Sequence, residues 1–517
     1  MKLFKKGLTI VAGTLCLASM ALTGCGGGSA ATGSETSASP SESTTADASE
    51  APASTQKVDI LWYAAGASTP EDMPKVLEAA NKYLEEKGIP ANLKIEMYDF
   101  GTYPDKLQTA ISSGEEFDIC FTCNWCNDYF TQARKGAYVP LNDDQKMLET
   151  YAPKTKELLG EDFLAGSQID GINYAIPANK EKAHQWGFLV LKQYADKYKM
   201  DFSNVKSLAD MEPFFQTIKD NEPSIYAFES LQGESAYRLL DFDRIGGENY
   251  PGVVTNDTTD YKVFNELEAP ESKEFFTLMH KFYQAGYIKE DADTITDYTQ
   301  DQKAGKMFCA TRSLKPGKDV EEGASMGQEY IQINITDPVM SNRETTGSMQ
   351  AISSTSKHPD VALQVLELFN TDPYFNNLIN FGIEGEHYDK VSDNVIKAGA
   401  NQNKYNLSLG WAFGNQFLNY LWESEDPEKW DKFEAFNEEA KPTQTLGFVF
   451  NTDNVQTEIA QCANVWKQYV PGLETGKLDP EEMLPVAIEA MKAAGSDTII
   501  QEKQAQLDAW VAATKNK

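Results

Sequence analysis

The chain has 517 residues and a formal net charge of −32, from 78 acidic and 46 basic residues. This charge would repel phosphate backbones, which argues against a nucleic acid as a partner. The length exceeds what one ordinary hydrophobic core needs, so two lobes or domains are expected.

The N-terminus has the pattern of a secretory signal, because basic residues precede an apolar run over residues 8–22. That run is too short to cross a hydrocarbon core of roughly 30 Å as a helix. Leu22-Thr23-Gly24-Cys25 follows and resembles the lipobox of bacterial lipoproteins. The resemblance implies a signal peptide over residues 1–24 and a lipid such as palmitate on Cys25, which would anchor the protein to the extracellular face of the cell membrane. An ordinary cleaved signal with a chance cysteine is the alternative.

Residues 25–56 form the expected tether behind that anchor. Gly, Ser, Ala and Thr dominate this stretch and large apolar residues are nearly absent. Such a segment buries too little surface to offset its ordering entropy, so we expect a flexible linker with an r.m.s. reach near ~30 Å.

The folded part opens with alternating strand and helix patterns. Strands are predicted over residues 58–63, 93–98 and 117–121, and amphipathic helices over Met73–Lys87 and Tyr103–Ser113. This order predicts a parallel sheet with right-handed crossovers, and therefore an α/β fold.

Ligands of such sheets bind beyond the carboxyl ends of the strands. Trp62 and Tyr63 lie at the end of the first predicted strand, and Asn124 and Trp125 follow the third. We expect these four side chains to line a cleft, although each tryptophan could instead cap the core.

Three cysteines lie in one C-x-x-C-x-x-C run, at Cys120, Cys123 and Cys126. A metal cluster needs four ligands, and a fourth cysteine is not nearby, so no metal site is predicted. A disulfide and free thiols both remain open.

Catalytic motifs are not supported by their surroundings. Gly323-Ala324-Ser325-Met326-Gly327 matches the pattern of a nucleophile elbow, but it lacks the preceding strand and following helix that the motif requires. The four histidines are scattered, and no pair of carboxylates is singled out among the many acids. We therefore predict no catalytic residues and no cofactor.

Several segments of the chain carry a family resemblance. "VDILWYAAG", "GAYVPLND" and "IDGINYAIPANKEKAHQWGFLVLK" resemble passages of extracellular solute-binding proteins of ABC importers, in the sugar-binding branch. The tail from "GFVFNTDNVQTEIAQ" onward resembles a subgroup whose C-terminal region is a domain of unknown function. The resemblance covers residues 57–512.

The resemblance implies a periplasmic-binding-protein-like fold, with two α/β lobes, a hinge and an interlobe cleft. Lobe 1 would take residues 57–180 and 330–372, the second part starting with a strand near 329–335 that returns to the first sheet. Lobe 2 would take residues 181–329 and 373–517.

Four residues are candidates for the opposite wall of the cleft: Trp186, Arg312, Glu384 and Trp411. Arg312 follows an apolar run as a strand end would, and Trp411 lies between glycines that suggest close backbone approach. Arg312 could equally form a surface ion pair, and Trp411 could equally be a core residue.

The sequence thus favours a lipid-anchored receptor, not an enzyme. It would capture a carbohydrate, specifically an oligosaccharide, and deliver it to ABC permease subunits. Two alternatives stay open: an exported glycan hydrolase or esterase, and the same binding fold with a peptide or another polar solute as cargo.

Overall fold

The computed structural model describes residues 56–66, 68–231, 234–247 and 249–514. The predicted signal peptide, the lipidation site at Cys25 and nearly all of the linker lie outside these residues. Within the described ranges, every helix is too short or too polar to cross a bilayer.

The first sheet has the strand order β2-β1-β3-β14-β6. Strands β1, β2 and β3 are mutually parallel, whereas β14 runs antiparallel to both β3 and β6. The predicted parallel βαβαβ unit is therefore confirmed. The strands are β1 (Val58–Gly66), β2 (Ala91–Asp99), β3 (Ile119–Thr122), β6 (Ala175–Pro177) and β14 (Met349–Ile352).

Local sequence accounts for the elements of this unit. Helix α1 buries Met73, Val76, Ala80 and Leu84, which share one face at helical spacing. Helix α2 ends at Gly114, whose φ of 68° is the left-handed conformation that glycine adopts without strain. The helices around this sheet are α1 (Met73–Glu86), α2 (Tyr103–Ser113), α3 (Tyr129–Arg134), α4 (Met147–Tyr151), α5 (Pro153–Leu159), α6 (Glu161–Ala165), α12 (Asn342–Thr345), α13 (Pro359–Thr371) and α14 (Pro373–Phe381), with a hairpin of β4 (Gln168–Ile169) and β5 (Ile172–Asn173).

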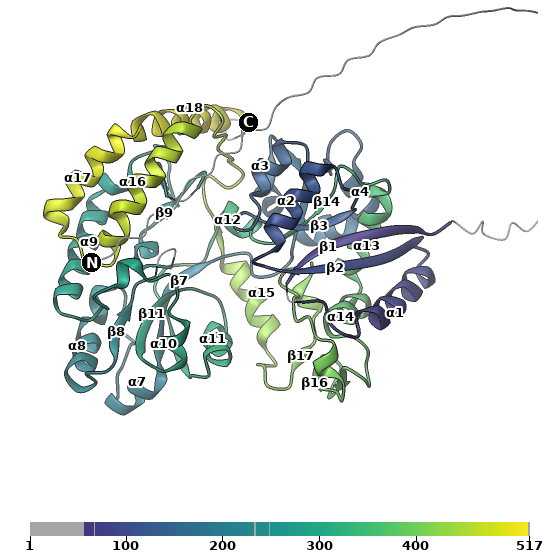
Figure 1. The fold of residues 1–517 in the computed structure, drawn as a ribbon, viewed down its shortest axis with the longest axis horizontal. Helices are drawn as coiled ribbons and strands as arrows, with labels where there is room; N and C mark the ends of the chain where they lie inside the picture. Colours follow the sequence, from purple (N-terminus) through teal and green to yellow (C-terminus); the bar gives the residue numbers. More distant parts are fainter. Residues whose placement is uncertain (1–55, 67, 232–233, 248, 515–517) are drawn as a thin grey trace, which may run out of the picture. The chain divides into compact units, whose positions relative to one another are not determined.

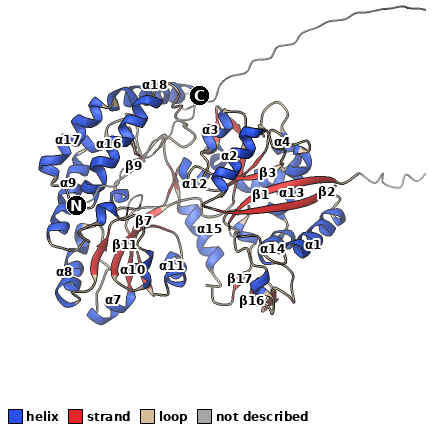
Figure 2. Ribbon diagram, in the orientation of Figure 1, coloured by secondary structure: helices blue, strands red, loops and turns tan. Residues whose placement is uncertain are grey.

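The second sheet has the order β12-β7-β11-β8 and lies in a separate group of elements (Figures 1 and 2). Its elements, together with the helices packed around them, are β7 (Gln185–Leu191), β8 (Tyr226–Glu229), β9 (Phe242–Asp243), β10 (Val254–Thr255), β11 (Met307–Leu314), β12 (Tyr330–Asn334), α7 (Lys192–Tyr198), α8 (Glu212–Asn221), α9 (Pro270–Gln284), α10 (Thr299–Lys303), α11 (Lys318–Met326), α16 (Gln456–Glu474), α17 (Pro480–Ala493) and α18 (Ser496–Thr514). Figure 1 shows α16 and α17, in yellow-green and yellow, beside α9 of this group, and α18 packed on α16 and α17.

Two hydrophobic cores define the lobes. The core of lobe 1 draws on residues 60–176 and 340–413. The core of lobe 2 draws on residues 188–333 and 448–507. The chain passes between the two cores three times, near residues 177–187, 334–339 and 414–447.

These cores correct two of the predicted boundaries. Strand β12 pairs antiparallel with β7, so residues 330–334 complete the sheet of lobe 2 and do not return to lobe 1. Helix α14 and residues 405–413 pack in the core of lobe 1, so they belong there and not to lobe 2. Strand periodicity does not identify a strand's partner, which explains the first error.

A third, smaller group of elements follows α14. Phe381, Tyr388 and Ile396 form its buried cluster. The elements here and at the crossings are β13 (Val339–Met340), β15 (Tyr388–Lys390), β16 (Val395–Ala398), β17 (Leu421–Trp422), α15 (Lys429–Glu439) and β18 (Lys441–Pro442).

Candidate ligand-binding site

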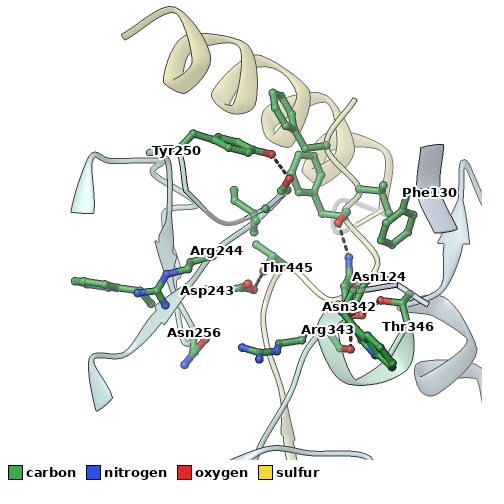
Figure 3. A pocket seen from close by; sticks show the side chains of 18 of the residues that line it. Asn124, Phe130, Asp243, Arg244, Tyr250, Asn256, Asn342, Arg343, Thr346 and Thr445 are labelled. Carbon is green, nitrogen blue, oxygen red and sulfur yellow. Dashed lines mark hydrogen bonds between the residues drawn. The ribbon is translucent and has the colours of Figure 1, made fainter. Parts of the chain in front are cut away.

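A pocket of about 1060 Å³ is lined by residues of both lobes and of the crossing segments. Lobe 1 contributes the loop after β3, helix α3 and helix α12. Lobe 2 contributes Arg238, residues 240–247, Tyr250 and Asn256, and the chain entering α16 also lines the pocket. Figure 3 shows polar side chains from these segments facing one another. The lining includes Asn124, Trp125, Arg134, His184, Trp186, Arg238, Asp241, Asp243, Arg244, Asn256, Arg343 and Thr445.

The loop after β3 is held in place by its own side chains. Asn127 Oδ1 accepts hydrogen bonds from Cys123 N and Thr122 Oγ1, both at 3.1 Å. Asn124 Nδ2 donates to Thr346 Oγ1 and to a backbone carbonyl of α12, both at 2.9 Å. The loop is therefore fixed to α12, and both line one wall of the pocket.

Trp125 is the exposed aromatic side chain of this wall, with 55% of its surface accessible. Its Nε1 donates to the carbonyl of Gly347 at 2.7 Å, which fixes the orientation of the ring. Phe100 and Trp411 support it from behind, with ring centroids 5.7 and 6.5 Å away. A large apolar face is thus presented to the pocket in a fixed orientation.

Two carboxylates line the wall that lobe 2 supplies. Asn256 Nδ2 donates to Asp241, and Thr445 Oγ1 donates to Asp243. Burial raises the pKa of both aspartates, and these hydrogen bonds act in the opposite direction. Both are acceptors for hydroxyl or N–H groups of a ligand.

Guanidinium groups surround Trp186. The guanidinium carbons of Arg238 and Arg343 lie 5.9 and 5.7 Å from its ring centre, within cation–π range. Trp186 is only 4% exposed, so it supports the arginines and offers no open stacking face. Since Arg343 belongs to α12 and Arg238 to lobe 2, this cluster brings residues of both lobes together.

Helix α12 is capped on the pocket side. Ser341 and Glu344 form a capping box at its first turn. Glu344 also contacts His184 Nδ1 at 2.8 Å. Burial alone would raise the pKa of Glu344, but the nearby His184 and Arg343 and the hydrogen bond of Ser341 lower it to about 2. Glu344 thus fixes the helix that carries Arg343.

The structure brings Asn124, Trp125 and Trp186 of the predicted site together at the pocket. Trp62 and Tyr63 instead lie in the core of lobe 1. Trp62 is completely buried and donates from Nε1 to Gln350 at 2.9 Å, and Tyr63 is 2% exposed. The reason is that other parts of lobe 1 pack on both faces of β1. Trp62 contacts Phe369 of α13 and Phe413, and Tyr63 stacks on Phe117.

The other predicted residues also lie outside the pocket lining. Arg312 is buried and pairs with Glu229 at 2.9 Å inside lobe 2. Glu384 is an exposed residue that contacts Lys390. Trp411 is half-buried behind Trp125 and stacks on Phe100 at 5.7 Å, so it supports the wall from behind.

Most of the charged residues that line the pocket were not predicted from the sequence. The stretch "DFDRIGG" at residues 241–247 offered a signal, because charged side chains and glycines follow one another without helical or strand periodicity. Arg134 on α3 gave no such signal. Its guanidinium donates to the carbonyls of Val449 and Phe450, at 3.4 and 3.3 Å. It therefore joins α3 to the segment that enters α16.

One group of three side chains with metal-binding atoms lies close together in the described ranges: Asp72, Glu386 and His387. His387 Nδ1 accepts a hydrogen bond from Ile383 N, so its Nε2 carries the proton and donates to Asp72 at 3.1 Å. This is a hydrogen-bonded pair and not a set of ligands. The three clustered cysteines do not converge in this way.

Two lobes around a polar pocket with one exposed aromatic face define a solute-binding protein, and comparisons with known proteins agree. Residues 444–512 match a domain of unknown function, DUF3502. A carbohydrate ABC transporter substrate-binding protein of Streptococcus pneumoniae serotype 4 is 31% identical over 92% of this chain and 94% of its own. The chain belongs to this family of substrate-binding proteins.

Solved structures support the same assignment. The N-glycan transport solute binding protein NgtS from Streptococcus pneumoniae is 28% identical, with a TM-score of 0.80 over 88% of this chain and 99% of that one. NgtS in complex with Man5GlcNAc gives a TM-score of 0.68 over 89% of this chain and 99% of that one. The predicted two-lobed fold and the prediction of a binding protein instead of an enzyme are thereby confirmed.

Proposed function

We propose that the pocket of this carbohydrate-binding protein captures an oligosaccharide of the N-glycan type and presents it to an ABC permease. The observation that carries the proposal is the pocket's composition. The exposed ring of Trp125 lies on the lobe 1 wall, and Asp241, Asp243 and Arg238 line the lobe 2 wall.

Sugars need this combination of surfaces. The C–H face of a pyranose is mildly apolar and packs on a flat aromatic ring, whereas its hydroxyls need directional polar partners. Carboxylates accept from hydroxyl groups and guanidinium groups donate to their oxygens. The volume of about 1060 Å³ is at the upper end of the ~300–1,000 Å³ of ordinary small-molecule sites, which leaves room for several sugar rings.

The relative NgtS, solved with Man1GlcNAc and with Man5GlcNAc, supports mannose-containing N-glycans as the ligand class. Isothermal titration calorimetry with Man5GlcNAc and Man1GlcNAc tests this directly. We expect a micromolar or lower Kd, about −8 kcal/mol or more favourable, for the larger glycan. Tight binding of peptides with no glycan binding would contradict the proposal, and release of glycan fragments would favour the alternative of a hydrolase.

We also propose that a lipid on Cys25 holds the protein at the extracellular face of the cell membrane. The support is the order of basic residues, apolar run and small residues before this cysteine. In cells fed a labelled palmitate analogue, the wild-type protein should carry label and stay with the membrane fraction. Cys25→Ala should carry none and appear in the medium; equal labelling of both would contradict the assignment.

A further inference from the structure

Two cysteines flank the pocket residues of the loop after β3. Cys123 and Cys126 are the first and last residues of the turn that carries Asn124 and Trp125. They stand three positions apart in the chain, on either side of these two residues. Cys123 is completely buried and Cys126 is half-buried, and both are reduced in the structure.

The two thiols differ in reactivity. The neighbouring Cys123 thiol lowers the pKa of Cys126, and burial raises the pKa of Cys123. The thiolate is the nucleophile of thiol–disulfide exchange, so the more accessible Cys126 would react first and Cys123 would resolve the intermediate.

The remaining free cysteines are less suited to this chemistry. Cys120 is buried on β3, where burial raises its pKa despite a hydrogen bond from Tyr138. Cys309 and Cys462 lie in the core of lobe 2.

We propose that Cys123 and Cys126 form a dithiol–disulfide pair whose oxidation state controls the shape of the pocket wall. The oxidant is a disulfide, either a small molecule or an extracytoplasmic thiol–disulfide oxidoreductase. The Cys126 thiolate attacks one sulfur of that disulfide and expels the other as a thiolate. Cys123 then loses its proton and attacks Cys126 Sγ, which expels the second thiol. Two protein thiols are oxidised, and one disulfide is reduced to two thiols.

Oxidation would act on the pocket through the turn. A disulfide needs an S–S distance of about 2.05 Å, far shorter than the contact between two thiols that are not covalently bonded. Asn124 N donates to Thr346 O at 2.9 Å, and Trp125 Nε1 donates to Gly347 O at 2.7 Å. Drawing the sulfurs together moves the turn against these contacts, so the oxidised protein should bind its ligand more weakly. This last step rests on the proposed function.

The first test needs no ligand. The purified protein is treated with oxidised glutathione, alkylated and mapped by peptide mass spectrometry. We expect a Cys123–Cys126 disulfide that dithiothreitol reduces. This disulfide should be absent from Cys126→Ser and present in the control Cys120→Ser. Unmodified thiols, glutathione left on Cys126 or a bridge to Cys120 would each overturn the proposal.

The second test measures the effect on the pocket. The oxidised protein should bind Man5GlcNAc at least fivefold more weakly than the reduced protein, and amide exchange in residues 341–347 should be faster. The double variant Cys123→Ser/Cys126→Ser should show neither response. If the reduced protein binds no glycan, the proposed function fails while the exchange measurement still tests the pair. Unchanged exchange and unchanged affinity after oxidation would overturn it.

Discussion

At the scale of single residues, Trp125 differs from the other aromatic side chains of the pocket because its ring is both exposed and fixed. Trp125→Ala removes the apolar platform without opening a cavity in either core. We expect at least tenfold weaker binding of Man5GlcNAc, about 1.4 kcal/mol, and a nearly unchanged melting temperature. Calorimetry and thermal unfolding measure the two effects.

Tyr374→Ala is the matched control, because Tyr374 is 50% exposed and lies outside the pocket lining. It removes an exposed ring of similar accessibility, so its glycan affinity should equal that of the wild type. Equal affinities of the Trp125 variant and the wild type would show that the ligand does not stack on this residue.

Asp243 gives the pocket a dependence on pH. Burial raises its pKa above the ordinary 3.8, so its carboxyl group takes up a proton at a higher pH than an exposed aspartate would. A protonated carboxyl is a weaker acceptor for sugar hydroxyls than a carboxylate. We therefore expect the affinity for Man5GlcNAc to fall between neutral and acidic pH, and to begin falling at a higher pH than titration of an exposed aspartate would give.

Two variants separate this effect from other titrations. Asp243→Asn should bind weakly at both pH values, with a flatter profile. In Asp241→Asn, the loss of glycan affinity that protonation of Asp243 causes should remain. If the affinity of Asp243→Asn fell with pH as much as that of the wild type, the titrating group would not be Asp243.

At the scale of elements, α12 depends on the cap that Glu344 provides. The folded-state pKa of about 2 lies below the ordinary 4.5, so the carboxylate stabilises the fold above about pH 4.5, and this contribution is lost as the pH falls through about 2. The shift corresponds to a free energy on the order of 3 kcal/mol. Glu344→Gln should therefore lower the free energy of unfolding by about 2–3 kcal/mol at neutral pH and by much less near pH 3.

Urea unfolding at both pH values measures this difference. Ser341→Ala is the control, since it removes a capping hydroxyl without removing a charge. Its cost should be about 1 kcal/mol. This cost should depend on pH less than that of Glu344→Gln, because the Ser341 hydroxyl supplies only part of what lowers the pKa of Glu344. A pH-independent cost for Glu344→Gln would show that the ion pair with His184 contributes little.

The elements also show what could be predicted from the sequence. The start of α1 at Met73 and both ends of α2 follow from apolar spacing, proline and glycine, which act within a few residues. The loop carrying Asn124 and Trp125 was found because a parallel sheet places such loops at its carboxyl edge.

Long-range pairing could not be predicted in this way. Strand β12 has the alternation that either sheet would accept, and its partner β7 lies some 140 positions earlier in the chain. Trp62 was expected at a strand end, but β1 continues to Gly66, so its side chain lies in the core, whereas Trp125 follows the end of β3 and is exposed. Arg343 reaches the pocket only because the tertiary fold places α12 beside the second lobe's Trp186.

At the scale of the whole molecule, the pocket depends on two lobes that each supply one wall. A ligand that contacts both walls favours the arrangement in which they lie closest together. The three NgtS structures give TM-scores of 0.80 for the one named without a sugar and 0.70 and 0.68 for those named with one. This chain therefore matches the structure named without a sugar better, and glycan binding should bring the lobes closer together.

Small-angle X-ray scattering tests this closure. With saturating Man5GlcNAc, we expect the radius of gyration to fall by a few per cent from its ligand-free value, because hinge closure moves the lobes toward each other. Trp125→Ala, compared at a glycan concentration that saturates only the wild type, should remain extended, since an interaction lost from one wall removes part of the free energy that favours closure. If calorimetry shows the wild type to be saturated and the scattering curve does not change, the pocket binds its glycan without closing, and delivery to the permease must rest on a signal other than the distance between the lobes.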